Sequence, residues 1–574
     1  MSVRYAVSLV LNAHLPYVRE YTAPPRNLAL LSNGQPLPNG QPLPEQSSAE
    51  EQPLGEEPPE EINPTPGSVE ESWFFETLSE TYLPLLMMFD RLEADHVPFR
   101  LGLSLSPVFA QMLGDELLLK KYAAYLDNQI DFGRQEIERL DRENVPQNGD
   151  PSSGNLRRLA QRYFDQAIDR RAAFTTRYEG SIFKAFDYYQ RKRKIEFLAA
   201  PATHAFLPFL CPFPEAVQAQ IETALSFYRY ALSINPQGFW LPELGWSKDI
   251  DPFLRSYGFN YTIADTHGFA LGNPPPSRGC FFPIRTPHGI FVLSRDFDAC
   301  SGIAAMRQEG PYRDNSRDIG YELPAEMIGP FLAQNGARCQ TGYKYWQSGD
   351  TPYNPQAAQA AAQDHARTFL ENCFARLDSV LQHTTDLPLS LCAFNADSFG
   401  RHWHEGPLFL ENLFRFAENY RELQFMTPSE YLYHQQISAL EVSLPEFSSW
   451  GDNGYAETWL DSSNDWIYRH LNRSIDRMIE MADRFSRNSS LKERALNQAA
   501  REILLAMASD WPALLYRQEC TDYARRQVED SLHNFTTIYE ALGSNYISTE
   551  WLTNLESRHD VFSNINYRVF KRKH

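Results

Sequence analysis

A glutamate in an aromatic setting is the first candidate for chemistry in this sequence. Glu243 follows the apolar run 238–241 and Pro242, and Trp240 and Trp246 lie within three residues of it. Flat aromatic faces stack on sugar rings and can hold them against a catalytic group. The stretch therefore indicates a carbohydrate site in which Glu243 is the reactive carboxylate. The plainer alternative, a helix cap or a solvated loop residue, is left open by this stretch alone.

Polar side chains recur just after the other apolar runs that read as short strands. The strands expected at 5–11, 197–200, 261–264 and 387–394 are followed by these candidates: Asn12, His14, His204, Asp265, His267, Asn395 and Asp397. In barrels of parallel strands the chemistry is found at the carboxyl ends of the strands. The pattern therefore predicts one shared site, although a capped loop histidine remains the plain interpretation of His14.

The elements that must position these residues alternate between strand and helix. Apolar residues recur at three- and four-residue spacing in 73–96, and further helices are expected at 221–232, 249–257 and 354–377. Such alternation predicts parallel βα units, and contributions from several strand ends favour a barrel over an open sheet. The segment 273–317 is rich in Pro, Gly and Arg and poor in periodicity, so we expect a long loop, for example a lid.

Two further regions read as helical additions to this α/β core. Residues 116–190 are mostly charged and helical in pattern, which predicts an insertion rather than an ordinary crossover. The segments 466–485, 491–515 and 523–542 are amphipathic. We therefore predict a barrel domain over 1–415 and a helical C-terminal domain over 416–574, which would cover or flank the barrel mouth.

The stretch 32–67 has a different composition. It contains two copies of Asn-Gly-Gln-Pro-Leu-Pro, at 33–38 and 39–44, followed by seven glutamates without any Lys or Arg. Proline and like charge cannot build a core, so we expect a disordered acidic surface loop without chemistry of its own.

Composition excludes several classes of partner. The 574 residues carry 53 Lys and Arg against 73 Asp and Glu, a net charge of −20, which argues against nucleic acid and suits a neutral substrate. No window approaches the roughly 20 apolar residues of a membrane span, and the apolar start is too short for a signal peptide. The seven cysteines are widely spaced without a CxxC pair, which indicates reduced thiols in a cytoplasmic protein.

Five ordered stretches resemble the motifs of glycoside hydrolase family 57. They are Leu-Asn-Ala-His-Leu-Pro at 11–16, Leu-Ser-Leu-Ser-Pro at 103–107, Phe-Trp-Leu-Pro-Glu at 239–243, the run 394–407 and Ser-Ser-Trp-Gly at 448–451. The tail, with Ala-Ser-Asp-Trp-Pro at 508–512, is similar to the helical C-terminal domain of that family's α-1,4-glucan branching enzymes. The resemblance implies an incomplete (β/α)7 barrel with a helical insertion and an all-α C-terminal domain. It further implies a retaining mechanism on α-glucan with a Glu nucleophile, an Asp acid/base and no cofactor.

Residue by residue, the resemblance assigns Glu243 as the nucleophile but departs from the family elsewhere. Asn395 falls at the family's acid/base position, and Asp397 falls where the family has Glu. Asn12 replaces the first His of the first motif, and Tyr312 is the nearest candidate for the acceptor-site tyrosine of branching enzymes. The substrate-binding positions that the resemblance suggests are Asn12, His14, His204, Trp240, Asp265, His267, Trp403 and Trp450.

The amide at 395 opens alternatives, because retention needs one carboxylate to attack and one acid to protonate the leaving oxygen. The first hypothesis is an active branching-type transferase that uses Glu243 and Asp397; a 4-α-glucanotransferase or amylase is a variant of it. The second is a catalytically degenerate glucan-binding or regulatory protein with an aromatic platform of Trp240, Trp246, Trp403 and Trp450. The third, a metal-dependent hydrolase using His14, Asp265, His267, His402 and His404, has no closed ligand spacing, so no metal is expected.

Overall fold

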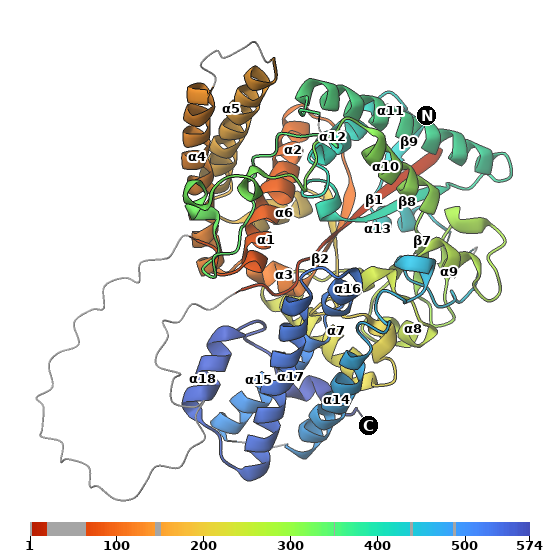
Figure 1. Ribbon diagram of the computed structural model, residues 1–574. Coiled ribbons are helices and arrows are strands. Elements are labelled where there is room, and N and C mark those ends of the chain that lie inside the picture. The colour runs from red at the N-terminus through yellow and green to blue at the C-terminus, as the bar shows by residue number, and fades with distance from the viewer. Residues whose placement is uncertain are drawn as a thin grey trace, which may run out of the picture.

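Figure 1 shows the computed structural model of the chain. It describes residues 3–19, 65–143, 151–348, 351–436, 440–485 and 489–573, without the side chains of 143 and 151–154. The acidic and proline-rich loop predicted at 32–67 lies outside the described residues as far as residue 64.

The first sheet is built around β1 (Tyr5–Ala13), whose nine residues are all buried. It pairs in parallel with β2 (Leu101–Leu105), β8 (Leu389–Asn395) and β9 (Leu423–Phe425), and β3 (Ile195–Leu198) is parallel to β2. Strands buried on both faces read as continuous apolar runs, which is why 5–11 could be recognised from the sequence.

A second sheet is built from strands that follow β3 in the chain. Parallel strands β4 (Gly238–Phe239), β5 (Tyr261–Ala264) and β7 (Phe291–Ser294) lie side by side, and the short β6 (Ile284–Arg285) runs antiparallel to β7.

Isolated contacts at two seams connect the two sheets. Ala199 forms a parallel bridge with Phe239, and the Asp296 N–H donates to the Leu391 carbonyl at 2.7 Å. The ring order is therefore β1, β2, β3, β4, β5, β7 and β8. This arrangement confirms the predicted incomplete (β/α)7 barrel.

Helices pack around this ring. The barrel carries α1 (Val69–Thr77), α2 (Leu83–Ala94), α3 (Pro107–Met112), α7 (Pro214–Tyr230), α8 (Asp251–Ser256), α9 (Thr266–Ala270), α11 (Pro355–Leu381), α12 (Gly406–Ala417) and α13 (Pro428–Tyr433). The helical insertion consists of α4 (Glu116–Glu143), α5 (Pro151–Ala172) and α6 (Ile182–Arg191), of which α4 and α5 stand side by side in Figure 1.

The prediction of a long loop at 273–317 is wrong, because this segment contributes a barrel strand and a helix. It contains β7 and α10 (Phe297–Glu309), which begins where the Asp296 carboxylate accepts from the Ala299 N–H at 3.0 Å. A strand of four residues with three of them buried shows no alternation, and the surrounding Pro, Gly and Arg hide its signal.

The C-terminal region is helical, with α14 (Trp466–Arg484), α15 (Ser490–Ala506), α16 (Asp510–Arg517), α17 (Thr521–Ser544) and α18 (Thr549–Arg558). The turn between α15 and α16 lies against the barrel: Ala205 bridges Ala508, and the Ser509 N–H donates to the His204 carbonyl at 3.2 Å. The domain boundary expected between 415 and 416 lies before β9. Because β9 is hydrogen-bonded to β1, the chain still contributes to the barrel sheet after residue 416. None of the described helices is long and apolar enough to cross a membrane.

Candidate active site at the barrel mouth

Glu243 is held in an unusual backbone conformation directly after β4. It lies in a single turn, Pro242–Leu244, with φ 60° and ψ 18°, and Leu244 follows with φ 50°. Two successive non-glycine residues in the left-handed region are uncommon and cluster at functional sites. The Glu243 carbonyl accepts from the Trp450 N–H at 2.9 Å, so the Ser-Ser-Trp-Gly stretch supports this turn.

The Glu243 carboxylate receives hydrogen bonds from two other parts of the chain. Its Oε2 accepts from the Trp450 indole N–H at 2.7 Å, and its Oε1 accepts from the Ser509 hydroxyl at 3.3 Å. Burial raises the pKa of Glu243, the Trp450 hydrogen bond opposes that rise, and the negative charge of Asp510 adds to it. With its side chain 16% exposed, Glu243 is a fixed and still reachable carboxylate, as a nucleophile requires.

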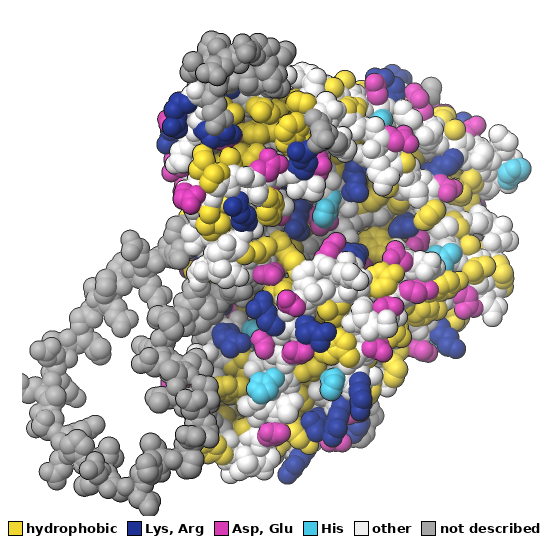
Figure 2. All heavy atoms as spheres, viewed as in Figure 1, with side chains coloured by type: hydrophobic (Ala, Val, Ile, Leu, Met, Phe, Trp, Pro, Cys, Tyr) yellow, Lys and Arg dark blue, Asp and Glu magenta, His cyan; other side chains and the backbone are white. Residues whose placement is uncertain are grey.

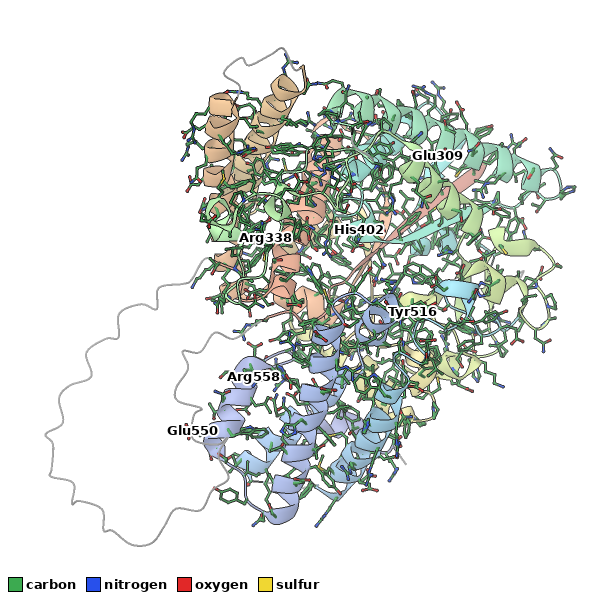
Figure 3. All side chains as sticks on the ribbon, in the orientation of Figure 1. Glu309, Arg338, His402, Tyr516, Glu550 and Arg558 are labelled. Atoms are coloured by element: carbon green, nitrogen blue, oxygen red, sulfur yellow. The ribbon has the colours of Figure 1, made fainter. Side chains whose placement is uncertain are left out.

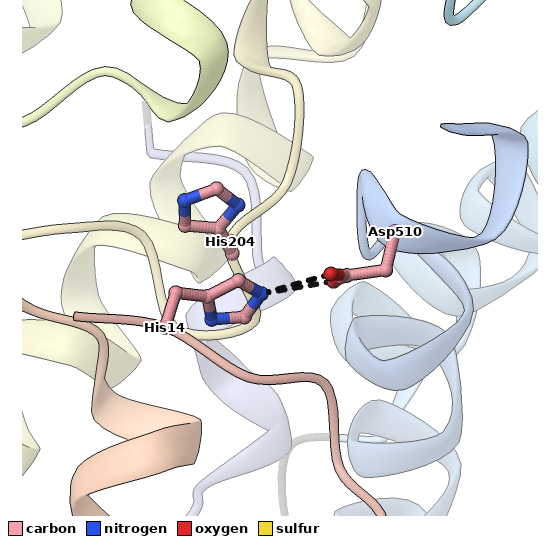
Figure 4. Close-up of side chains that lie close together, drawn as sticks. All are labelled: His14, His204 and Asp510. Carbon is pink, nitrogen blue, oxygen red and sulfur yellow. Dashed lines mark hydrogen bonds and ion pairs between the residues drawn. The ribbon is translucent and has the colours of Figure 1, made fainter. Parts of the chain in front are cut away.

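Two histidines lie beside this carboxylate, and Figure 4 shows that their rings are stacked. The rings of His14 and His204 are parallel within 6°, with centroids 3.8 Å apart. His204 lies with Nδ1 3.0 Å from the Ser509 hydroxyl and 3.8 Å from Glu243 Oε1. Burial first, and the neighbouring His14 second, hold the pKa of His204 well below its usual range, so His204 is neutral.

His14 connects the barrel to the helical domain. Its Nδ1 is 2.8 Å from the Ser106 hydroxyl, and its Nε2 is 2.9 and 3.1 Å from the two oxygens of Asp510. Asp510 begins α16, so a carboxylate of the C-terminal domain reaches into the barrel mouth.

His14, His204 and Asp510 also have the spacing of a possible metal site, with ligand atoms within 4.8 Å of one another. An imidazole lone pair lies in the plane of its ring. Because the two rings are stacked face to face, their lone pairs point along parallel planes and do not converge on one ion. This geometry fits a hydrogen-bonded stack better than a shared cation. Asp265, His267, His402 and His404, predicted as ligands with His14, do not belong to this cluster.

The amide that falls at the acid/base position lies at the end of β8. Asn395 is the register partner of Asn12 on β1, and the Asn12 amide donates to Asn395 Oδ1 at 3.0 Å. The same Asn12 nitrogen lies 3.1 Å from His204 Nε2, so Asn395 is connected to Glu243 through Asn12 and His204. Asn395 is exposed to the mouth and carries no titrating proton.

Asp397 is engaged in an ion pair. It lies in the turn Ala396–Ser398, with Oδ2 3.2 Å from His402 Nε2. Burial alone would raise the pKa of Asp397, but His402 and Arg401 lower it overall. Asp397 is therefore ionised at neutral pH, which suits a base better than an acid.

Asp265 and His267 are connected to the segment that carries Trp450. Asp265 caps α9 by accepting from the Thr266 N–H at 2.7 Å, and it lies 3.2 Å from the Arg295 guanidinium, which faces the Trp450 ring at 5.9 Å. His267 Nε2 lies 2.5 Å from the Gly454 carbonyl. His267 thus contacts the segment that carries Trp450, and Asp265 is linked to the Trp450 ring through Arg295.

The predicted aromatic platform is wrong for three of its four tryptophans. Trp240 and Trp246 are fully buried and Trp403 is 2% exposed, so these indoles pack in the core and cannot stack on a sugar. Trp450 remains partly exposed. Tyr312 is also buried, packed edge-on against Trp403 with its hydroxyl 2.8 Å from His365. His404 lies 3.4 Å from the buried Glu80, away from the mouth cluster.

Three residues of the site were not recognised as candidates from the sequence. Ser106, Ser509 and Asp510 contact the catalytic cluster, and the last two come from a segment about 270 residues after Glu243. The available signal was the resemblance: Ser106 falls within the motif-like stretch 103–107, and Ser509 and Asp510 fall within the stretch that resembles the branching-enzyme tail.

The surface is recessed where barrel and helical domain meet (Figure 2). Figure 3 labels His402 on the barrel side of this region and Tyr516, from α16, on the helical side. The recess thus lies between the ends of the barrel strands and the element that carries Asp510.

Comparison with known proteins shows which family this chain resembles in sequence. Residues 50–443 match the model of glycosyl hydrolase family 57, and residues 470–570 match the C-terminal region of 1,4-alpha-glucan branching enzymes. A 1,4-alpha-glucan branching enzyme of Thermococcus kodakarensis is 25% identical over 484 residues, 80% of this chain and 68% of that protein. A probable 1,4-alpha-glucan branching enzyme of Mycobacterium tuberculosis is 23% identical over 488 residues, 83% of this chain and 89% of that protein.

Solved structures agree in fold over the whole chain. The alpha-amylase AmyC from Thermotoga maritima superposes with a TM-score of 0.82 at 30% identity, covering 100% of both chains. A family 57 branching enzyme from Pyrococcus horikoshii gives a TM-score of 0.80 at 23% identity, covering 100% of this chain and 97% of the other. Because the family model spans more than half of the sequence and the site is assembled on the matching strands, the chain belongs to glycoside hydrolase family 57.

Proposed function

We propose that this protein transfers glycosyl groups on α-1,4-glucan chains, in the manner of a branching enzyme, with Glu243 as the nucleophile. The observation that carries the proposal is the Glu243 carboxylate itself, which is fixed by donors from Trp450 and Ser509 and remains 16% exposed. Matches to branching enzymes in both the barrel and the C-terminal region support an α-glucan as substrate.

The chemistry follows from the carboxylate. A Glu243 oxygen bonds to the anomeric carbon of a bound glucan as the bond to the leaving oxygen breaks and that oxygen takes a proton. The hydroxyl of an acceptor then displaces Glu243 from the covalent glycosyl-enzyme and gives up its proton, with net retention. An acceptor at the 6-position gives an α-1,6 branch, a 4-hydroxyl gives a rearranged chain, and water gives hydrolysis. Asp397 is the acid/base residue that the sequence suggests. His14 would line the subsite around Glu243, and the buried Asn12 and His204 would support it from behind.

The test is incubation with amylose, followed by debranching and chain-length analysis. We expect α-1,6 branch points with the wild-type protein and their loss in Glu243→Gln, which keeps the shape of the side chain and removes its negative charge. Linear products or reducing ends would instead indicate a 4-α-glucanotransferase or an amylase. Unchanged amylose would contradict turnover on glucan altogether.

A second candidate function is glucan binding without turnover. It is favoured by the neutral amide of Asn395, which is hydrogen-bonded to a second amide, Asn12. If this candidate holds, wild-type protein will retain glucan in affinity electrophoresis without altering it. Asn395→Asp would then create activity, since the nucleophile is already in place.

The compartment that fits the chain is the cytoplasm. All seven cysteines are unpaired, and four of them are buried, as expected for a protein kept in a reducing environment.

A further inference from the structure

The family position for the acid is an amide in this chain, while the helical domain brings a carboxylate close to Glu243. Ser509 donates to Glu243 Oε1 at 3.3 Å, and Asp510 is the next residue. Among the charged groups acting on Glu243, the carboxylate of Asp510 has the largest influence on its pKa. Asn395 and Asp397, by contrast, lie on the β8 side of the mouth.

The geometry points to Asp510 as the acid/base partner of Glu243, with His14 as the residue that positions it. This inference rests on the proposed glycosyl transfer and assigns to the helical domain a catalytic residue that the barrel lacks.

The contacts of the pair decide which member can reach a substrate. His14 has both ring nitrogens engaged, Nδ1 with Ser106 at 2.8 Å and Nε2 with Asp510 at 2.9 Å. The Asp510 carboxylate has further lone pairs beyond its contact with His14, and its side chain is 17% exposed against 8% for His14. Asp510 is therefore the member that can meet the oxygen of a glycosidic bond.

His14 also gives Asp510 access to a proton. His14 Nε2 lies 2.9 Å from Asp510 Oδ2, so a proton can pass between the imidazole and the carboxylate along this hydrogen bond. The stack against His204, which is neutral, fixes the plane of the His14 ring and hence the approach of Asp510 (Figure 4). Asp397 is also in contact with an imidazole, that of His402 at 3.2 Å. What distinguishes Asp510 is its neighbour Ser509, whose hydroxyl donates to Glu243.

The two half-reactions balance with these groups. In the first, a Glu243 oxygen bonds to the anomeric carbon as the bond to the leaving oxygen breaks; its electron pair stays on that oxygen, which takes the proton held by Asp510 and His14. In the second, the acceptor hydroxyl gives its proton to Asp510 while its oxygen bonds to the anomeric carbon, and the electron pair of the bond to Glu243 returns to that carboxylate. No redox partner is needed.

The experiment compares two donors that differ in their need for an acid. Amylose has a leaving oxygen that must be protonated, whereas fluoride leaves α-maltosyl fluoride without a proton. Asp510→Asn should lower the rate on amylose about 10²–10⁴-fold and the glycosylation step with α-maltosyl fluoride far less. Azide, which attacks without a base, should restore turnover of the fluoride by this variant and give α-maltosyl azide.

Three further variants keep the result interpretable. Asp510→Glu retains the carboxyl group and should keep more activity on amylose than Asp510→Asn at a similar melting temperature. Asp397→Asn should not show the donor-dependent pattern. Asp560→Asn is the matched control, because Asp560 also links the helical domain to the barrel, through the Tyr17 hydroxyl at 2.9 Å, but outside the site. It should keep wild-type rates on both donors.

Other outcomes separate this inference from the proposed function. An equal loss on both donors in Asp510→Asn, or the donor-dependent pattern in Asp397→Asn instead, would overturn the role of Asp510 and leave Glu243 as nucleophile. Wild-type turnover of the fluoride without any turnover of amylose would show that the acid is missing altogether. A wild type inactive on both donors would refute the glycosyl transfer and this inference with it.

Discussion

The indole of Trp450 donates to Glu243 and so influences the pH at which that carboxylate loses its proton. A hydrogen bond to the ionised form lowers a carboxyl pKa, and here it opposes the rise caused by burial. Trp450→Phe should therefore raise the pKa of Glu243. Since the nucleophile must be ionised, the acidic limb of kcat/KM should move to higher pH, and the rate near neutral pH should fall less than the rate at pH 5.

Trp459→Phe is the control for this prediction. Trp459 is buried with an indole N–H that has no partner in the described part of the chain, so its loss removes no hydrogen bond. A pH profile measured with α-maltosyl fluoride as donor reports the nucleophile directly. An acidic limb that stays in place in Trp450→Phe would mean that this hydrogen bond does not control Glu243.

At this scale the sequence could predict residues on barrel strands and failed on residues that depend on packing. Asn12, His14 and His204 come together with Glu243 because each lies at or after the carboxyl end of a strand of the same ring. Trp240 looks equally suitable in the sequence, yet it is fully buried. Barrel strands are covered on both faces, by the barrel interior and by helices, so an aromatic residue beside a catalytic one is commonly core.

Among the elements, the π-helical turn Leu78–Tyr82 between α1 and α2 fixes the segment that follows β8. Gly400, with φ 157°, approaches this turn so closely that a Cβ would lie 2.3 Å from the Glu80 carbonyl, and the Arg401 N–H donates to the Thr81 hydroxyl at 3.0 Å. Glu80 itself is buried and pairs with Arg313 at 2.6 Å. Desolvation opposes ionisation, but Arg313 and Arg170 hold the pKa of Glu80 well below its usual range.

Removing one member of this buried pair should destabilise the fold strongly. Arg313→Met leaves Glu80 in a desolvated place with Arg170 at 3.6 Å as its nearest remaining cation, and breaking a buried ion pair costs about 3–5 kcal/mol. Urea unfolding should show this loss. Arg171→Met breaks an exposed ion pair with Asp127 on the helical insertion. This variant should lower the free energy of unfolding by only about 0.2–1 kcal/mol.

The pH dependence gives a second check on the Glu80 pair. A carboxylate with a depressed pKa in the folded state contributes stability above the unfolded pKa, about 4.3, and loses it as the pH falls. The difference in stability between wild type and Arg313→Met should therefore narrow below pH 4. A difference that stays constant between pH 7 and pH 3.5 would contradict an ionised Glu80.

Elements with strong periodicity were predictable, and short buried ones were not. The helices over 466–485 and 523–542 appear as α14 and α17 within two residues at each end, because an amphipathic pattern of five turns is unambiguous. The segment 273–317 was misread because β7 has only four residues. The expected helix over 491–515 is split into α15 and α16, and that break places Ser509 and Asp510 at the mouth.

At the scale of the whole molecule, the site is shared between two parts of the chain that have separate hydrophobic patterns. The barrel provides Glu243, His14 and His204, and the helical domain provides Ser509 and Asp510. Sequence periodicity could predict both parts, but it contains no information on how one faces the other. The placement of Asp510 opposite His14 therefore required the three-dimensional arrangement.

The charge of the whole molecule leads to a last prediction, on the kind of ligand it binds. A net charge of −20 repels polyanions, whereas an α-glucan is neutral and releases no counterions on binding. The Kd for amylopectin in affinity electrophoresis or calorimetry should change less than about twofold between 50 and 500 mM NaCl, because hydrogen bonds and apolar contacts are weakly screened. Heparin, a polyanionic polysaccharide, is the control and should not bind even at 50 mM. A tenfold weakening of glucan binding with salt, or retention of heparin at low salt, would show that a basic surface rather than the recess at the barrel mouth carries recognition.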